Sequence, residues 1–241
     1  MFGRATFIAR RSERSNMDRE AMKRRAAERA VERVEDGSVV GLGSGSTAAF
    51  AIRAMGERTE DGLSVRGIPT SFQSRVLAIE SGIDVVALDQ VERVDVAIDG
   101  ADKIAGADLI KGGGASHALE KVVDAAAEEF LVVADETKLA NRLEDPVPVE
   151  VLPDARTTVA DSVRRLDGTP ELREAERKSG PVVTDNGNLV LDCSFGPIDD
   201  PATLAAELAA IPGTVEHGLF VAMADAIYVG TDSGVDVLET F

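Results

Sequence analysis

Three glycine-bearing segments carry the residue types that could bind an anion and move protons. The first, Gly41 to Thr47, follows a short apolar run and precedes a helical pattern. Its glycines let the backbone approach an anion, and its amides and hydroxyls can hold a phosphate at a helix start. It lacks the lysine of a Walker loop, and Ser46 replaces the third glycine of a dinucleotide fingerprint. An ordinary turn with a Ser/Thr cap is the alternative.

The second segment is Asp99-Gly100-Ala101-Asp102, at the end of the apolar run 94–98. Two carboxylates three residues apart suit hydroxyl binding, proton transfer or a metal ion. A metal site usually needs more ligands, and no histidine or cysteine accompanies this pair. In a chain with 43 acidic residues, an Asp-rich turn without chemistry is the competing interpretation.

The third segment is Lys111 followed by Gly112, Gly113 and Gly114. Consecutive glycines cost backbone entropy, so they indicate a close approach to a ligand. Lys111 can stabilise an oxyanion, and Glu120 on the helical pattern that follows can act as a base. A lone glutamate on a helix is more commonly a solvated surface residue.

Short β-branched runs alternate with helical patterns over the first half of the chain, from Asp18 onward. Strands are predicted at 38–43, 63–69, 84–88, 94–100 and 130–135, and helices at 18–36, 46–58, 75–82 and 117–129. This alternation predicts an α/β fold built on a Rossmann-like parallel sheet with both faces covered. In such sheets the loops at the carboxyl ends of the strands can face one site.

The second half predicts a smaller α+β (ferredoxin-like) domain at 146–217, bounded by the Pro-rich edges of residues 145–153. A helix at 155–166, a strand at 170–174, a hairpin at 182–193 and a helix at 200–213 precede a last strand. Asn186-Gly187 marks the hairpin turn. The tail 218–231 reads as one strand returning to the first sheet, so 17–145 and 218–241 would form the α/β catalytic domain.

Composition excludes several classes of partner. The net charge of −17 argues against nucleic acid, and no apolar run reaches the roughly 18 residues of a membrane span. Cys193, in an apolar run, is predicted to be a buried structural thiol, which suits a reducing cytoplasm. The Arg-rich residues 1–16 resemble a transit peptide, but we expect a disordered leader or an upstream extension before a natural start at Met17.

Taken together, GSGST, DGAD and KGGG, with Glu120 nine positions after Lys111, resemble the type A ribose-5-phosphate isomerases. The resemblance extends from Met17 to the end and includes PTSFQS, VADETK and VVTDNGN. One departure is Lys103, where many members carry an acid, and we expect it to alter only a flanking salt bridge. The acid-rich, lysine-poor composition further suggests a halophilic archaeal member.

The resemblance implies a role for each segment. Glu120 would be the base that moves a proton between C1 and C2 of ribose 5-phosphate through a cis-enediol. Asp99 and Asp102 would bind sugar hydroxyls and assist proton transfer in ring opening and at O1 and O2. Lys111, with backbone N–H groups of the triglycine loop, would stabilise the enediolate oxygen. Further substrate-binding positions are Ser44, Gly45, Ser46, Thr47, Gly100, Ala101, Gly112, Gly113, Gly114 and Lys138, with Lys23 as a weaker phosphate candidate.

The same resemblance implies a cytoplasmic homodimer or homotetramer that uses no cofactor and no metal. A dinucleotide-dependent oxidoreductase would need the missing third glycine and an acid after the second strand, where 65–69 offers none. A non-catalytic sugar-phosphate sensor on the same fold is the remaining alternative, but it has no reason to keep Glu120, Lys111 and both aspartates. His117 and His217 are expected to be surface or packing residues.

The excess of 43 acidic over 26 basic residues generates a prediction about salt. Like-charge repulsion in dilute buffer is screened as the Debye length falls from about 10 Å at 0.1 M to about 3 Å at 1 M salt. The thermal midpoint should therefore rise steeply between low and molar KCl, as followed by circular dichroism. A midpoint that stays flat or falls over this range would contradict the halophilic interpretation.

Overall fold

The computed structural model describes residues 18–240, so the expectation for the leader lies outside the described residues. Seven strands form the main sheet in the order β14-β13-β7-β4-β1-β2-β3. They are β1 (Val39–Leu42), β2 (Arg66–Pro69), β3 (Asp84–Val85), β4 (Val94–Gly100), β7 (Ala127–Asp135), β13 (Ala226–Gly230) and β14 (Val235–Glu239). All neighbours run parallel except the β13–β14 pair, which is antiparallel. The predicted α/β fold with a mainly parallel sheet is confirmed.

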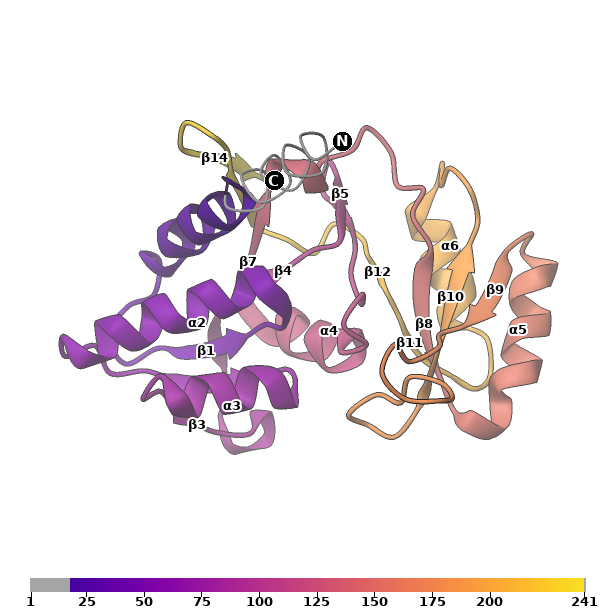
Figure 1. Cartoon of the computed structure of the whole chain (residues 1–241), viewed down its shortest axis with the longest axis horizontal. Helices are drawn as coiled ribbons and strands as arrows, with labels where there is room; N and C mark the ends of the chain where they lie inside the picture. The colour runs from indigo at the N-terminus through magenta and orange to yellow at the C-terminus, as the bar shows by residue number, and fades with distance from the viewer. Residues whose placement is uncertain (1–17, 241) are drawn as a thin grey trace, which may run out of the picture.

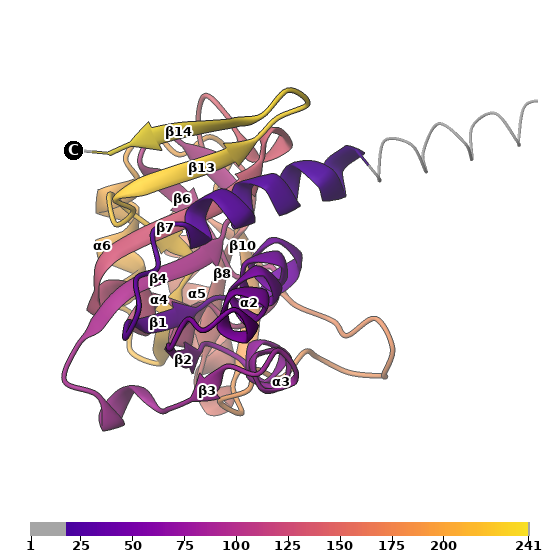
Figure 2. The same ribbon diagram turned by 90° about the vertical axis from the view of Figure 1, so that its left-hand side faces the viewer.

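Helices cover both faces of this sheet, as Figures 1 and 2 show. The helix at 18–31, α2 (Gly45–Glu60) and α3 (Phe72–Glu80) lie on one face, and α4 (His117–Ala126) lies on the other. Successive side chains of a strand point to opposite faces of the sheet, so β4 contributes to the hydrophobic cores on both faces. Ile98 packs with the first helices, while its neighbour Ala97 packs on the opposite side. Helix α4 ends sooner than predicted, since residues 127–129 already belong to β7.

A third, unpredicted sheet bridges the two halves of the chain. It consists of β5 (Lys103–Ala105), β6 (Asp108–Ile110) and β12 (Leu219–Phe220), all antiparallel. Strands of two or three residues are too short to show a period in sequence. The tail at 218–231, predicted as one strand, is therefore two strands, β12 and β13, which belong to different sheets, and β14 follows beyond it.

The smaller layer has four antiparallel strands in the order β11-β8-β10-β9. They are β8 (Val147–Val151), β9 (Thr169–Leu172), β10 (Leu189–Ser194) and β11 (Thr214–His217), with α5 (Arg156–Arg165) and α6 (Pro201–Ala209) between them. The segment interpreted only as a Pro-rich boundary is in fact the inner strand β8. Its alternate residues Val147, Val149 and Val151 are fully buried, and this burial outweighs the flanking prolines.

The predicted hairpin at 182–193 exists only in part. Its turn forms, with Gly187 at φ +84° and its amide donating to the carbonyl of Thr184. The first arm, however, pairs with β10 only through the isolated bridge Val183–Leu189, while β10 pairs with β8 and β9 instead. Within residues 18–240, no helix is long and apolar enough to cross a membrane.

Close packing of the helix at 18–31 against β13 generates a prediction about stability. A Cβ added at Gly230 would lie 1.9 Å from the carbonyl oxygen of Met22, so the helix backbone would have to shift. Gly230→Ala should lower the free energy of unfolding by roughly 1–3 kcal/mol, the usual cost of overpacking.

Urea denaturation followed by circular dichroism measures this effect. Gly234→Ala is the matched control in the same hairpin, because a Cβ there meets nothing within 4 Å. Equal stability of the two variants would show that the helix does not pack tightly on β13.

Candidate active site

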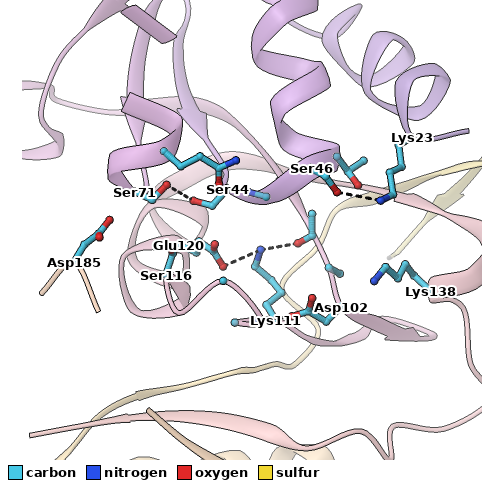
Figure 3. Close-up of a pocket in the computed structure, with 18 residues that line it drawn as sticks. Lys23, Ser44, Ser46, Ser71, Asp102, Lys111, Ser116, Glu120, Lys138 and Asp185 are labelled. Atoms are coloured by element: carbon cyan, nitrogen blue, oxygen red, sulfur yellow. Dashed lines mark hydrogen bonds and ion pairs between the residues drawn. The ribbon is translucent and has the colours of Figure 1, made fainter. Parts of the chain in front are cut away.

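The three glycine-bearing loops meet at one cavity of about 250 Å³, at the carboxyl ends of β1 and β4 (Figure 3). Thirteen of the fourteen proposed site residues line it, and so does the weaker candidate Lys23. The thirteen are Ser44, Gly45, Ser46, Thr47, Gly100, Ala101, Asp102, Lys111, Gly112, Gly113, Gly114, Glu120 and Lys138. The fold thus brings the first loop together with two loops that follow it by more than fifty positions in sequence.

The loop after β1 leaves the start of α2 without a side-chain cap, although the amide of Gly45 donates to Gln73 Oε1. Ser44 stands at the N-cap of α2 but makes no side-chain capping bond, because its hydroxyl donates to Ser71 Oγ at 2.7 Å. The alternative of an ordinary Ser/Thr-capped turn is therefore wrong. The nearby Lys23 Nζ donates to Ser46 Oγ at 3.0 Å, and Lys138 lies on the same side of the cavity in Figure 3. An anion is favoured here.

Lys111 is the electrostatic centre of the cavity. Its Nζ lies 2.7 Å from Asp99 Oδ2 and 3.3 Å from Glu120 Oε2, and it donates to the carbonyl of Gly100 at 2.6 Å. All three ionisable side chains are buried, with Lys111 only 2% exposed. The ring of Phe220 lies 5.2 Å from Nζ on a further side. A single cation is therefore held between two carboxyl groups in a place shielded from water.

Asp99 is the one proposed site residue that does not line the cavity. It lies under the loop after β1, where its Oδ1 accepts hydrogen bonds from the amides of Ser44 at 3.0 Å and Gly100 at 2.6 Å. The approach is so close that a Cβ at Gly43 would lie 2.0 Å from Oδ1, which explains the glycine. In this structure Asp99 contacts the loop and Lys111.

Burial and mutual repulsion shift the pKa values of the carboxyl groups upward. Burial, aided by Asp99, raises the pKa of Glu120 to about 7, although Lys111 opposes the shift. Burial also raises the pKa of Asp99, and it raises that of Asp124, one turn along α4, well above its usual range. For Lys111, burial favours the neutral form, but the surrounding carboxylates outweigh it and hold the pKa above its ordinary value. Glu120 can therefore exchange a proton near neutral pH.

The triglycine loop is held tightly by its surroundings. Gly112 has φ +108°, and a Cβ there would lie 2.6 Å from the ring of His117, so glycine is required on both counts. The amide of Gly113 donates to Asp102 Oδ2 at 2.7 Å. Ala115, which closes the loop, adopts φ +61°, and its amide donates to the carbonyl of Gly112. These contacts therefore fix the conformation of the loop.

Sequence reasoning missed four cavity residues: Ser71, Gln73, Ser116 and Asp185. Ser71 caps α3, and Gln73 Oε1 accepts from the amide of Gly45. Asp185 comes from the smaller layer, and its Oδ2 accepts from the amide of Phe72 at 2.8 Å. Ser71, Gln73 and Asp185 lie in the quoted motifs PTSFQS and VVTDNGN, which were the available signal.

Several residues predicted to be structural lie outside the cavity. Cys193 and both histidines are buried packing residues, and Lys103 pairs with Asp145 at 3.4 Å. His217 does have a partner, because its ring Nδ1 lies 3.2 Å from Lys121 Nζ. Among the described residues, no group of three or more histidine, cysteine, aspartate or glutamate side chains could hold a metal ion.

The raised pKa of Glu120 generates a prediction about titration. The ¹³C shift of its carboxyl carbon should titrate near pH 7 in the unliganded protein, because burial disfavours the anion. Labelling with ¹³C-glutamate, with the resonance assigned by its loss in Glu120→Gln, measures this directly. The exposed Glu176 provides an internal reference in the same spectrum. A midpoint below pH 5 for Glu120 would contradict the structure.

Comparisons with known proteins identify the family of this chain. The profile of the family described as Ribose 5-phosphate isomerase A (phosphoriboisomerase A) matches residues 66–234. The ribose-5-phosphate isomerases A of Natronomonas pharaonis and Haloarcula marismortui are 66% and 65% identical to this chain. Each alignment covers 90% of this chain, with 96% of the first relative and 95% of the second.

Two solved structures superpose closely on this fold. One is a D-ribose-5-phosphate isomerase in complex with phospho-erythronic acid, with a TM-score of 0.89, 44% identity and coverage of 92% of this chain and 99% of that one. The other is ribose 5-phosphate isomerase A from Methanocaldococcus jannaschii, with a TM-score of 0.87, 46% identity and coverage of 90% and 98%. This chain belongs to the ribose 5-phosphate isomerase A family.

Proposed function

We propose that this chain interconverts D-ribose 5-phosphate and D-ribulose 5-phosphate through a cis-enediol intermediate, with Glu120 as the base. The observation that carries the assignment of roles is the contact between Lys111 Nζ and Glu120 Oε2, 3.3 Å apart at the cavity. A carboxyl group whose pKa is raised to about 7 stands beside a fixed cation. Removal of a proton next to a carbonyl needs this pair of groups.

The phosphate of the substrate would occupy the side of the cavity near Lys23 and Lys138. There the two lysines lie near Ser46 at the start of α2 (Figure 3), and Thr47 also lines the cavity. A helix start with added cations favours a dianion. With the phosphate anchored there, the sugar carbons extend toward Lys111 and Glu120 in the middle of the cavity.

The proton transfer takes place between C2 and C1 of the open-chain sugar. Glu120 takes the proton from C2 of the aldose, the C1 carbonyl becomes the enediolate oxygen, and the same carboxyl group returns the proton to C1. Lys111 stabilises the negative charge on the oxygen during this exchange. A proton passes from O2 to O1 to complete the ketose, and the free Oδ1 of Asp102 is available to assist it.

Asp99 contributes to this mechanism through Lys111. Its carboxylate lies 2.7 Å from Lys111 Nζ and accepts two backbone hydrogen bonds, so it fixes the ammonium group that faces the enediolate. We therefore assign Asp99 to positioning, in place of the hydroxyl binding expected from the resemblance. Asp102, which lines the cavity, keeps the hydroxyl-binding role.

A non-catalytic sensor of sugar phosphates is the second candidate on the same fold. Burial of Glu120 to 5% exposure, aided by the charges of Asp99 and Asp102, raises its pKa and so costs folding free energy. Binding of a neutral sugar and its phosphate needs no such strained carboxyl group. Family membership and this cost together favour the enzyme.

We also propose the division of the chain that the sequence predicts. Strands β8 to β11 with α5 and α6 follow one another as βαββαβ, which supports a ferredoxin-like unit at 146–217 beside an α/β unit of 17–145 and 218–241. Helix α3 exposes Phe72, Val76 and Ile79 at helical spacing, and this apolar face supports the expected homodimer or homotetramer.

The test of the proposed function is the variant Glu120→Gln. Turnover of ribose 5-phosphate should fall by roughly two to four orders of magnitude, the usual worth of a positioned base, while the Michaelis constant changes little. A coupled assay of ribulose 5-phosphate formation measures both, and the exposed Glu176→Gln serves as control. Wild-type protein that binds ribose 5-phosphate without converting it would instead support the sensor.

A further inference from the structure

A residue of the smaller layer, Arg173, reaches the triglycine loop of the site. Its Nη1 donates hydrogen bonds to the carbonyl of Gly112 at 2.8 Å and to that of Gly113 at 3.1 Å. Arg173 directly follows β9, and its side chain is only 15% exposed. From the sequence, Arg173 was assigned only to a predicted strand at 170–174 and to no role in the site.

The remaining nitrogens of the guanidinium are fixed by Asp192 on β10. Nε donates to Asp192 Oδ2 at 2.8 Å, and Nη2 donates to Oδ1 in a bidentate ion pair. The backbone of Arg173 is also held, because its amide donates to Val190 and its carbonyl accepts from Val182. The guanidinium is thus held by Asp192 of the smaller layer on one side and contacts the glycine loop on the other.

The contacts to two successive carbonyls determine the direction of the following amides. In a trans peptide the C=O and N–H bonds point in opposite directions, and residues 18–240 contain no cis peptide. The carbonyl of Gly112 faces Arg173, and the amide of Gly113 accordingly points the other way, to Asp102 Oδ2 at 2.7 Å. Asp102 lines the cavity, so this observed bond confirms the direction.

The next peptide repeats this geometry without a protein acceptor. The carbonyl of Gly113 also faces Arg173, which directs the amide of Gly114 to the same side. Gly114 lines the cavity, and within the described chain its N–H has no hydrogen-bond acceptor. The site therefore holds one free amide donor whose orientation depends on a residue of the other layer.

We propose that Arg173 is a positioning residue that aims the amide of Gly114 at the enediolate oxygen, with Asp192 holding Arg173 in place. This inference rests on the proposed isomerase function. The cationic guanidinium also polarises the two peptide groups, which makes their N–H groups stronger donors. A lysine could not serve the same four acceptors at once, because its ammonium group is a single point of charge.

The primary test compares Arg173→Gln with Arg177→Gln, an exposed arginine of the same segment that loses the same charge. Loss of one oxyanion donor costs about 10²–10³ in turnover, and here the donor is misdirected rather than removed. Arg173→Gln should therefore lower kcat roughly 10- to 100-fold with little change in KM, while Arg177→Gln should match the wild type.

A second readout separates positioning from a merely structural role. Phospho-erythronate, a four-carbon acid whose carboxylate carries charge like that of the enediolate, should bind Arg173→Gln more weakly by a factor similar to the loss in kcat. Isothermal titration calorimetry measures this affinity at a temperature where circular dichroism shows the variant to be folded. Arg173→Lys, which retains the charge, should recover only part of the kcat and part of the affinity for phospho-erythronate. If Arg173→Gln does not fold, Arg173→Lys takes its place in both measurements.

Three outcomes would overturn the inference. Unchanged kcat and phospho-erythronate affinity with a lower thermal midpoint would leave Arg173 only a structural tie between the layers. An increase in KM with unchanged kcat would place it in substrate binding. Full activity of Arg173→Lys would show that a positive charge alone, without the geometry of the guanidinium, is enough for catalysis. Failure of the proposed function is distinguishable, because then the wild type and Arg177→Gln would also fail to convert ribose 5-phosphate.

Discussion

A lysine buried among carboxyl groups is the constraint on which the rest of the site depends. An isolated buried ammonium would cost several kcal/mol of folding free energy, so the charged group of Lys111 needs carboxylate and carbonyl partners. Asp99 and the carbonyl of Gly100 at the end of β4 meet it from one element, and Glu120 on α4 meets it from another. The carboxylates around the lysine keep it charged, and burial at the same place raises the pKa of Glu120 to about 7, so that Glu120 can exchange a proton near neutral pH.

The two layers divide the work of building the cavity. The main sheet supplies the loops after β1 and β4, which bring Ser44 to Thr47 and Gly100 to Asp102 to the cavity, while the smaller layer contacts the glycine loop through Arg173. Gly218 joins the two through the backbone, with its carbonyl accepting from Lys111 and its amide donating to Pro148. A Cβ at this glycine would lie 2.1 Å from the carbonyl of Lys111, so the junction tolerates no side chain.

Helices and strands in which apolar residues recur at a regular spacing were predictable from the sequence, and those without such a spacing were not. Strand β4 and helix α4 stand out because apolar residues recur at their characteristic spacings over seven residues or more. Strands β5, β6 and β12, with two or three residues each, exist only because they pair with one another and cover Phe130 and Ile227. Strand β8 was hidden by the prolines around it, since burial in the smaller core is a property of the packed chain.

By itself, the sequence determined the order of the elements and the chemical types at the site, because helix and strand periods and the glycine, aspartate and lysine motifs are local properties. It pointed to Glu120 and Lys111 as base and electrophile before any distance was known. Only the tertiary structure decided that Asp99 lies behind Lys111 rather than in the cavity, and that Arg173 holds the glycine loop. The role of Asp99 depends on a contact with Ser44 across 55 positions, and that of Arg173 on a contact with Gly112 across 61. Desolvation and hydrogen-bond direction arise only when such segments pack.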